Sequence, residues 1–508
     1  MASTSPPRWR RLLDSPAAPV TLMVMSAGLI ALTILRFSVW IDESATLLLV
    51  GPHSVGEILS FTSWDAHPPL WYLVLKPWLA IFGANPLAAR SQSAIFMLAA
   101  FGVWYHFVKV RFSRPTALLA LALLVTNPML LHQAIEGRMY AFGTLLVASS
   151  CLLITGRWRW RWVAYWPCAV AMLWTHYFLA FVLLAQFLYL LVTRKEQARS
   201  FLWIVIFGAT IVATFLPQLS RALHMTNLVV ANGFWIGPLT PNSVVWYVWL
   251  TFLHRLDHEL EGWKFFIAII YIAAWGCSLV RAGRLRGGPY ALLWLIATIP
   301  MLCLFILSCK PFVPIFHARY VVFGLPAVIT LLAAGALSLA GRWRVLAIAI
   351  LIAGHVSGIL MLRWKGFNDT RGYWAMKAVA KDVSKPIDGE LPTVVSSWVF
   401  TFLDARATLD EKQRVVNFRE SAPLDYGFPD VMYAAHPEWY VLSLDDIHAR
   451  HVWFLDEHMH AETEVPKSWK LEVMHYRGYA RERLYTLPDS AVSPPPVSPV
   501  PSNPVPQP

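Results

Sequence analysis

Long apolar runs, separated by short polar segments, dominate the first 362 residues of the chain. Because an α-helix rises about 1.5 Å per residue, roughly 20 consecutive apolar residues are enough to cross a bilayer. The pattern predicts about eleven transmembrane helices between residues 17 and 362. The runs are 17–40, 89–109, 115–133, 138–156, 163–176, 178–193, 200–218, 263–280, 289–308, 320–340 and 345–362.

Basic residues cluster in short segments next to these runs. The positive-inside rule places such clusters in cytoplasmic loops. All of the clusters fall on one side if residues 1–16 are cytoplasmic, and the C-terminus is then external. The clusters are Arg8–Arg11, Lys109–Arg114, Arg157–Arg161, Arg194–Arg199, Arg281–Arg286 and Arg342–Arg344.

Two further apolar segments, 69–84 and 242–254, are interpreted as amphipathic helices on the external surface. Counting 69–84 as a span would move all later basic clusters to the outside, against the positive-inside rule. Lys76 and Pro77 also interrupt this segment. The first external loop is therefore expected to cover 41–88.

The composition becomes polar after residue 362, which predicts a small external α/β domain over 363–488. Strands are expected over 394–403, 438–444 and 451–457, and a helix over 370–383. The tail 489–508 is rich in proline and is expected to be extended and disordered. The predicted fold is an all-α polytopic membrane domain with external amphipathic helices and this α/β domain.

The composition supports a membrane protein and excludes other classes. Hydrophobic residues make up 57% of the chain and charged residues 14%, against roughly 25% charge in soluble domains. The net charge of +12 lies in the inter-helix clusters, so topology explains it and no nucleic-acid partner is expected. The five cysteines lie in or beside apolar runs without a CxxC or Cys/His metal spacing.

Polar residues recur at the external ends of the predicted helices. Taken singly, each has a structural explanation: a solvated helix end, a local ion pair, or a snorkelling cation. Their recurrence on one face favours a function, because ionisable groups at membrane depth cost several kcal/mol unless they are used or paired. The set is Asp42, Glu43, Asp65, His67, Lys76, Glu136, Arg138, Tyr140, His176, Tyr177, Lys310, His317, Arg319 and Tyr320.

These residues form an ordered series of motifs. Asp-Glu follows the first helix, His-Pro-Pro-Leu lies in the first loop, Glu-x-Arg-x-Tyr in the second, His-Tyr in the third, and Lys-Pro followed by Arg-Tyr precedes a late helix. From about residue 17 to 345 the chain resembles the GT-C superfamily of membrane glycosyltransferases. It is most similar to the bacterial family 39 type, with the protein O-mannosyltransferases and lipid A aminoarabinose transferases. Gly137 and Lys76 depart from that pattern, since relatives often carry Ala and His there.

The resemblance implies inverting sugar transfer from a polyprenyl-phosphate sugar to a lipid, glycan or protein hydroxyl at the outer face of a bacterial cytoplasmic membrane. It implies Asp42 as general base, with Glu43 and Glu136 as further catalytic carboxylates. Arg319, Arg138, Lys310 and Lys76 would bind the donor phosphate. The residues expected to contact substrate are Asp65, His67, Tyr140, His176, Tyr177, His317 and Tyr320.

Cofactor use and rival functions follow from the same residues. The chain has no DxD metal signature, and an arginine clamp can replace a metal, so no obligatory metal or other cofactor is expected. The main rival is a polytopic transporter or lipid flippase, which would place charges near the bilayer midplane and often contain repeats. A polymerase or ligase with a diphosphate-linked donor and a non-catalytic receptor are further alternatives. The sugar, the acceptor and the oligomeric state stay open.

Overall fold

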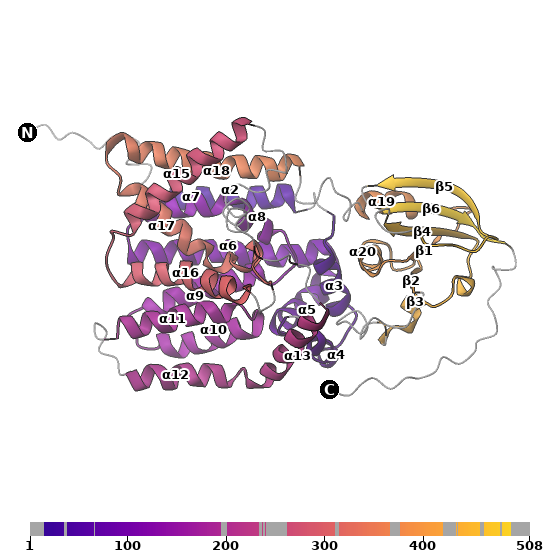
Figure 1. The fold of residues 1–508 in the computed structure, drawn as a ribbon, viewed down its shortest axis with the longest axis horizontal. Coiled ribbons are helices and arrows are strands. Elements are labelled where there is room, and N and C mark those ends of the chain that lie inside the picture. Colours follow the sequence, from indigo (N-terminus) through magenta and orange to yellow (C-terminus); the bar gives the residue numbers. More distant parts are fainter. Residues whose placement is uncertain are drawn as a thin grey trace, which may run out of the picture. The chain divides into compact units, whose positions relative to one another are not determined.

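The structure is a computed structural model, and its helices and strands are shown in Figure 1. It describes residues 15–34, 38–65, 67–194, 201–232, 236, 239, 262–309, 314–365, 376–419, 433, 435–457, 462–477 and 480–488. The chain divides into two compact units. The helical unit comprises Met1–Ile34, Ala66–Val74 and Arg90–Phe367, and the mixed unit comprises Leu35–Asp65, Leu75–Ala89 and Asn368–Pro508.

The helical unit is a bundle in which helices from distant parts of the sequence pack on one another (Figure 1). Within it α9 packs on α10, α11 on α16, and α17 on both α7 and α15. Its helices are α2 (Ala17–Thr33), α6 (Pro86–Arg111), α7 (Arg114–Val125), α8 (Pro128–Ala134), α9 (Tyr140–Thr155), α10 (Arg161–Thr175), α11 (Leu179–Val192), α12 (Phe201–Ala213), α13 (Leu216–Asn232), α15 (Gly262–Ala282), α16 (Gly288–Leu307), α17 (Leu325–Leu337) and α18 (Gly341–Lys365).

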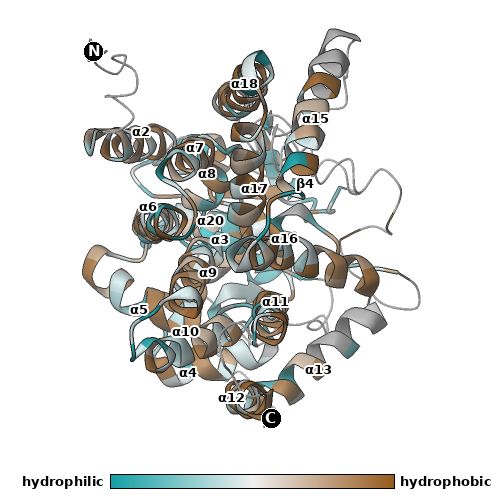
Figure 2. Cartoon of the chain, turned by 90° about the vertical axis from the view of Figure 1, so that its left-hand side faces the viewer, coloured by the Kyte–Doolittle hydropathy of each residue, from teal (hydrophilic) through white to brown (hydrophobic). Residues whose placement is uncertain are grey.

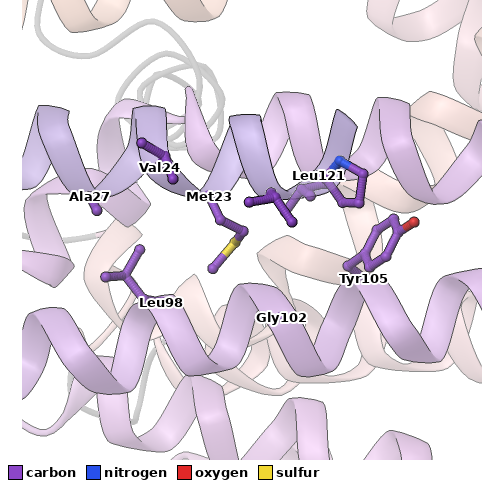
Figure 3. A pocket seen from close by; sticks show the side chains of 9 residues that line it. Met23, Val24, Ala27, Leu98, Gly102, Tyr105 and Leu121 are labelled. Atoms are coloured by element: carbon purple, nitrogen blue, oxygen red, sulfur yellow. The ribbon is translucent and has the colours of Figure 1, made fainter. Parts of the chain in front are cut away.

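Large hydrophobic side chains are exposed on several helices of this bundle. Figure 2 shows that most residues of these helices are hydrophobic. Such extensive apolar exposure is unusual in a soluble protein and matches a surface in contact with lipid. A cavity of about 340 Å³ between α2, α6 and α7 is also lined almost entirely by apolar atoms (Figure 3). Examples of the exposed side chains are Val20, Val24 and Leu32 on α2, Leu202, Ile206 and Val212 on α12, and Val345 and Leu360 on α18.

The described helices do not confirm eleven spans. Three are long and apolar enough to cross a membrane: Pro86–Arg111, Gly288–Leu307 and Gly341–Leu360. Two bent pairs raise the number to five if each pair is one span. The expected run 115–133 is such a pair, bent by 65°. The bend has a local cause, because Asn127 accepts the Leu130 N–H and Pro128 follows it, which starts a new helix.

The segment 69–84 forms a short helix, α5 (Leu70–Phe82), with Pro77 inside it. Its 13 residues reach about 20 Å, less than the roughly 30 Å of a hydrocarbon core. The helix is therefore too short to span alone, while its expected place on the external surface stays a prediction. The companion segment 242–254 lies outside the described residues.

Close packing between α15 and α17 depends on Gly335. A Cβ atom at this position would lie 1.8 Å from the Ser278 carbonyl oxygen. We expect Gly335→Ala to lower the free energy of unfolding by at least about 1–3 kcal/mol, because a backbone group would have to move. Thermal unfolding in detergent measures the effect. Gly276→Ala is the matched control on α15, since no atom lies within 4 Å of its Cβ position; equal melting temperatures of the two variants would contradict the packing.

The mixed unit contains a six-stranded sheet with the strand order β3-β2-β1-β4-β6-β5 (Figure 1). Strands β1 to β4 pair in parallel, whereas β6 pairs antiparallel with β4 and β5. A hydrophobic core that includes Val395, Val416 and Phe454 stabilises the sheet. The strands are β1 (Thr393–Ser396), β2 (Val415–Phe418), β3 (Tyr440–Val441), β4 (His451–Glu457), β5 (Lys470–Arg477) and β6 (Ala480–Thr486).

The mixed unit also contains four described helices that matter for the candidate site. They are α3 (Ile41–Val50), α4 (Val55–Phe61), α19 (Met376–Val383) and α20 (Val399–Thr408). Helix α20 packs on α3, on α19 and on the strands β1 and β2. Residues from the start of the chain and from its C-terminal third therefore share one compact unit.

The expected strands and helix of the C-terminal region are confirmed only in part. The strand over 451–457 is confirmed, and the helix over 370–383 is confirmed from Met376 onward, while 370–375 lie outside the described residues. The strand over 394–403 is wrong beyond Ser396, because α20 starts at Val399 and buries Phe402, Leu403 and Ala405 against its neighbours. The strand over 438–444 shortens to Tyr440–Val441 between two 3-10 turns.

Candidate active site

Several of the predicted site residues meet around His176 in the helical unit. They come from chain segments far apart: His67 precedes α5, Tyr140 starts α9, His176 ends α10, and Tyr320 precedes α17. The ring centroid of His176 lies 5.3 Å from that of His67, 5.7 Å from that of Tyr140 and 5.9 Å from that of Tyr320. The structure therefore brings together turns that the sequence predicted to lie on one face.

Arg138 supplies a buried cation to this cluster, with only 5% of its surface exposed. Its Nη1 lies 3.5 Å from the Tyr72 hydroxyl and its Nη2 lies 3.4 Å from Nδ1 of His67. A guanidinium can only donate hydrogen bonds, so Nδ1 of His67 accepts. The proton of the neutral His67 ring is then on Nε2.

Two further histidines have the same tautomer. Nδ1 of His176 accepts the Phe178 N–H at 3.2 Å, and Nδ1 of His317 accepts the Arg319 N–H at 3.3 Å. Burial, with Arg319 nearby, lowers the pKa of His317 to about 3, so this ring is neutral in the working pH range. Each ring caps its own turn through Nδ1, so the proton of the neutral ring is on Nε2.

The His176 Nε2–H is the most informative of these donors. The residue is 2% exposed, and within the described part of the chain no hydrogen-bond acceptor meets this nitrogen. A buried donor without a partner costs about 1–3 kcal/mol. Arg138 and Arg319 both act electrostatically on His176. A cluster with two guanidinium groups and several N–H and O–H donors is chemically suited to an oxyanion.

Glu136 brings a carboxylate to the same region. It is 4% exposed, and its Oε2 lies 3.6 Å from Nδ1 of His132, one turn earlier. Its backbone carbonyl accepts the Arg138 N–H at 2.8 Å, so the two residues share a tight turn. The charges of Glu136 and Arg138 both act on Tyr140.

Asp42 and Glu43 lie in the first turn of α3, in the mixed unit, and their environments differ. Glu43 is 2% exposed, and its Oε2 accepts the Trp40 N–H at 3.1 Å, so it caps the helix. Asp42 is partly exposed. Of the two carboxylates, Asp42 is therefore the one with access to solvent.

Sequence reasoning missed Asp404 on α20. This carboxyl group is 1% exposed, and its Oδ1 accepts a hydrogen bond of 2.5 Å from the Ser44 hydroxyl. The only signal in the sequence was an aspartate among apolar residues, Phe402 and Leu403, in a segment that was expected to be a strand. Because the contact joins positions 360 residues apart, no local pattern predicts it.

The other predicted site residues that the structure describes have local contacts of their own. Nζ of Lys76 donates to the carbonyl oxygens of Val50 and Gly51 at 3.0 and 2.9 Å, which stabilises the C-terminal end of α3. Asp65 follows a 3-10 turn in the mixed unit. Tyr177 packs against Phe215, with ring centroids 5.9 Å apart. Lys310 lies outside the described residues.

Among the described residues, Asp382, His475 and Glu482 form one group with metal-ligand chemistry, since their potential ligand atoms lie within 4.8 Å of one another. Arg477 forms an ion pair with Asp382, and its Nε lies 3.3 Å from Oε1 of Glu482. The guanidinium already supplies the positive charge that these carboxylates require. We therefore interpret the group as an ion-pair network of the sheet.

Comparison with known proteins links this geometry to a family. Residues 66–220, which include His67, Arg138 and His176, match the family model described as dolichyl-phosphate-mannose-protein mannosyltransferase. The crystal structure of ArnT from Cupriavidus metallidurans in the apo state matches with a TM-score of 0.57 and 13% identity, covering 94% of this chain and 99% of that chain. The resemblance to the GT-C superfamily is confirmed.

A second crystal structure of ArnT also matches the fold of this chain. ArnT from Cupriavidus metallidurans bound to undecaprenyl phosphate matches with a TM-score of 0.56, 12% identity and the same coverage of both chains. A comparison with curated proteins finds no match. Together, the family model and the fold support a membrane glycosyltransferase. At 12–13% identity the structures show a shared fold, and the roles of single residues rest on the geometry given above.

Proposed function

We propose that the chain is an inverting glycosyltransferase that uses a polyprenyl-phosphate sugar and acts at the external face of the cytoplasmic membrane. The observation that supports this most is the donor-rich cluster around His176. Its guanidinium groups and the buried Nε2–H of His176 match a phosphate better than any neutral ligand. ArnT, which has a similar fold, has been crystallised with undecaprenyl phosphate. This supports a lipid phosphate as the ligand of the present chain.

In the proposed reaction, Arg138 and Arg319 bind the donor phosphate. As the bond between the anomeric carbon and the phosphate oxygen breaks, the electron pair stays with the phosphate and its negative charge increases. Fixed guanidinium groups in a water-poor site stabilise that charge, and no strong general acid is needed. The buried Nε2–H of His176 would donate to a phosphate oxygen and so satisfy its missing hydrogen bond.

Asp42 is the proposed general base. The acceptor hydroxyl oxygen forms the new bond to the anomeric carbon from the side opposite the phosphate, and its proton passes to the Asp42 carboxylate. Displacement from the opposite side inverts the anomeric configuration. We also propose that the arginines take the place of a metal ion, so that transfer continues after treatment with EDTA; a loss of transfer that Mg²⁺ or Mn²⁺ restores would refute this part.

We further propose about eleven membrane crossings, a cytoplasmic N-terminus and an external C-terminal domain. The one-sided basic clusters support this topology. Asp445 is exposed in the C-terminal region, so a cysteine introduced there is a suitable reporter in a chain whose own cysteines are replaced by serine. We expect a membrane-impermeant thiol reagent to label it in intact cells, and labelling only after the cells are opened would contradict the topology.

A donor labelled separately in its sugar and its lipid tests the proposed function. Membranes from a strain lacking the protein are compared with membranes in which it has been restored. The proposal predicts that the sugar label moves to a new molecule while the lipid label becomes polyprenyl phosphate. Movement of the intact donor across the bilayer, with both labels still joined, would instead support a transporter or flippase.

A further inference from the structure

Asp404 is a buried carboxyl group that has no role in the proposed reaction as described above. It lies on α20, in the C-terminal third of the chain, and is 1% exposed. A hydrogen bond joins it to Ser44, two residues after Asp42 on α3. Ser44 is itself fully buried. The contact therefore connects the C-terminal region with the helix turn that carries the proposed base.

The C-terminal region holds the segment around α3 at three places. The Lys377 N–H donates to the Ser38 hydroxyl just before α3, at 3.4 Å. The Ser44 hydroxyl donates to Asp404 inside α3, at 2.5 Å. After α3, the Nε2 atoms of His53 and His436 lie 2.8 Å apart. Of these contacts, only the Asp404 contact lies in the helix itself, one turn or less from Asp42.

The charge state of Asp404 fits a structural contact better than an ion pair. Burial raises the pKa of this carboxyl group well above its usual range, and the carboxylates of Glu43 and Asp42 raise it further. The hydrogen bond from Ser44 opposes this effect. A neutral carboxyl group accepts the Ser44 hydrogen bond without adding a buried negative charge close to Glu43 and Asp42.

We propose that Asp404 is a positioning residue for Asp42, and that the C-terminal region fixes the first turns of α3 through the Asp404–Ser44 hydrogen bond. The inference rests on the proposed role of Asp42 as general base. A base acts only when it lies within hydrogen-bond distance of the acceptor proton, and a displacement of about 1 Å can cost roughly 10²-fold in rate. Asp404 acts on the reaction only through α3.

Three substitutions test the contact. Asp404→Ala removes the acceptor, Ser44→Ala removes the donor with little change in volume, and Asp404→Asn keeps a neutral acceptor of nearly the same shape. We expect kcat for sugar transfer to fall by roughly 10²-fold in Asp404→Ala and roughly tenfold in Ser44→Ala, with KM for the donor unchanged. Asp404→Asn should restore most of the rate. Asp445→Ala is the control, because Asp445 is an exposed aspartate of the same unit.

Amide hydrogen exchange in α3 gives a second readout that does not depend on activity. Loss of the contact should increase exchange at residues 43–50 in Asp404→Ala and Ser44→Ala, and leave it unchanged in Asp404→Asn and Asp445→Ala. If the wild-type protein does not transfer sugar, the proposed function fails and the exchange data alone decide the positioning role. Normal kcat and normal exchange in Ser44→Ala and Asp404→Ala would overturn the proposal. An equal fall in kcat in Asp404→Asn and Asp404→Ala would also overturn the proposal, because an ionised carboxylate would then be required.

Discussion

Asp42→Asn is expected to slow sugar transfer by roughly 10²–10⁴-fold, because the amide cannot accept the acceptor proton. The substitution is nearly isosteric at a partly exposed position, so folding and donor binding should persist. The melting temperature should change little, since such substitutions usually cost about 0.5 kcal/mol or less. Single-turnover transfer by the well-folded variant measures the effect. A near-normal rate would exclude Asp42 as the base.

Glu43→Gln is the matched control for this prediction. Glu43 accepts the Trp40 N–H through Oε2, and a glutamine keeps a side-chain acceptor for that bond. We therefore expect Glu43→Gln to retain most of the activity. A loss confined to Glu43→Gln would transfer the catalytic role to Glu43. If neither substitution matters, Glu136 becomes the next carboxylate to test.

Arg319→Ala is expected to weaken binding of a polyprenyl phosphate by roughly 10- to 150-fold, which corresponds to the 1.5–3 kcal/mol of a charged hydrogen bond. Arg319→Lys keeps the positive charge but loses the planar fork of donors, so it should restore only part of the affinity. Titration of the lipid phosphate into the purified protein measures both. Unchanged affinity in both variants would remove Arg319 from the site.

Arg286→Ala is the control for Arg319. Arg286 is exposed just before α16 begins, whereas Arg319 follows the end of the same helix. Removing either arginine changes the net charge by the same amount. A specific phosphate contact predicts an effect for Arg319 alone, while equal effects would indicate only a general attraction of the lipid phosphate to a basic protein.

The sequence could predict that the residues around His176 come together, because this depends only on the alternating direction of successive helices. If neighbouring helices run in opposite directions, every second turn returns to the same face, and His67, Arg138 and His176 belong to such turns. Their mutual contacts confirm that part of the expectation. Their roles in catalysis and binding stay predictions.

The Asp404 contact and the helix breaks could not be predicted in the same way. A hydrogen bond between Ser44 and Asp404 depends on how α20 packs on α3, and no residue near either position indicates it. The segment 394–403 contains β-branched and aromatic residues that favour a strand, yet tertiary packing makes its second half a helix. The run 115–133 was predicted as one helix because its hydropathy is continuous. Asn127-Pro128, a pair typical of a helix start, divides it into two helices.

The central claim is that the protein separates a sugar from a polyprenyl phosphate and transfers it to a hydroxyl acceptor. The most direct test is mass spectrometry of the products formed by the purified protein in liposomes that contain a polyprenyl-phosphate sugar and an envelope lipid extract as acceptor. The proposal predicts acceptor-dependent release of polyprenyl phosphate, a glycosylated product with inverted anomeric configuration, and almost none of either with Asp42→Asn. Intact donor after prolonged incubation with the wild-type protein, or equal release by wild type and Asp42→Asn, would contradict it.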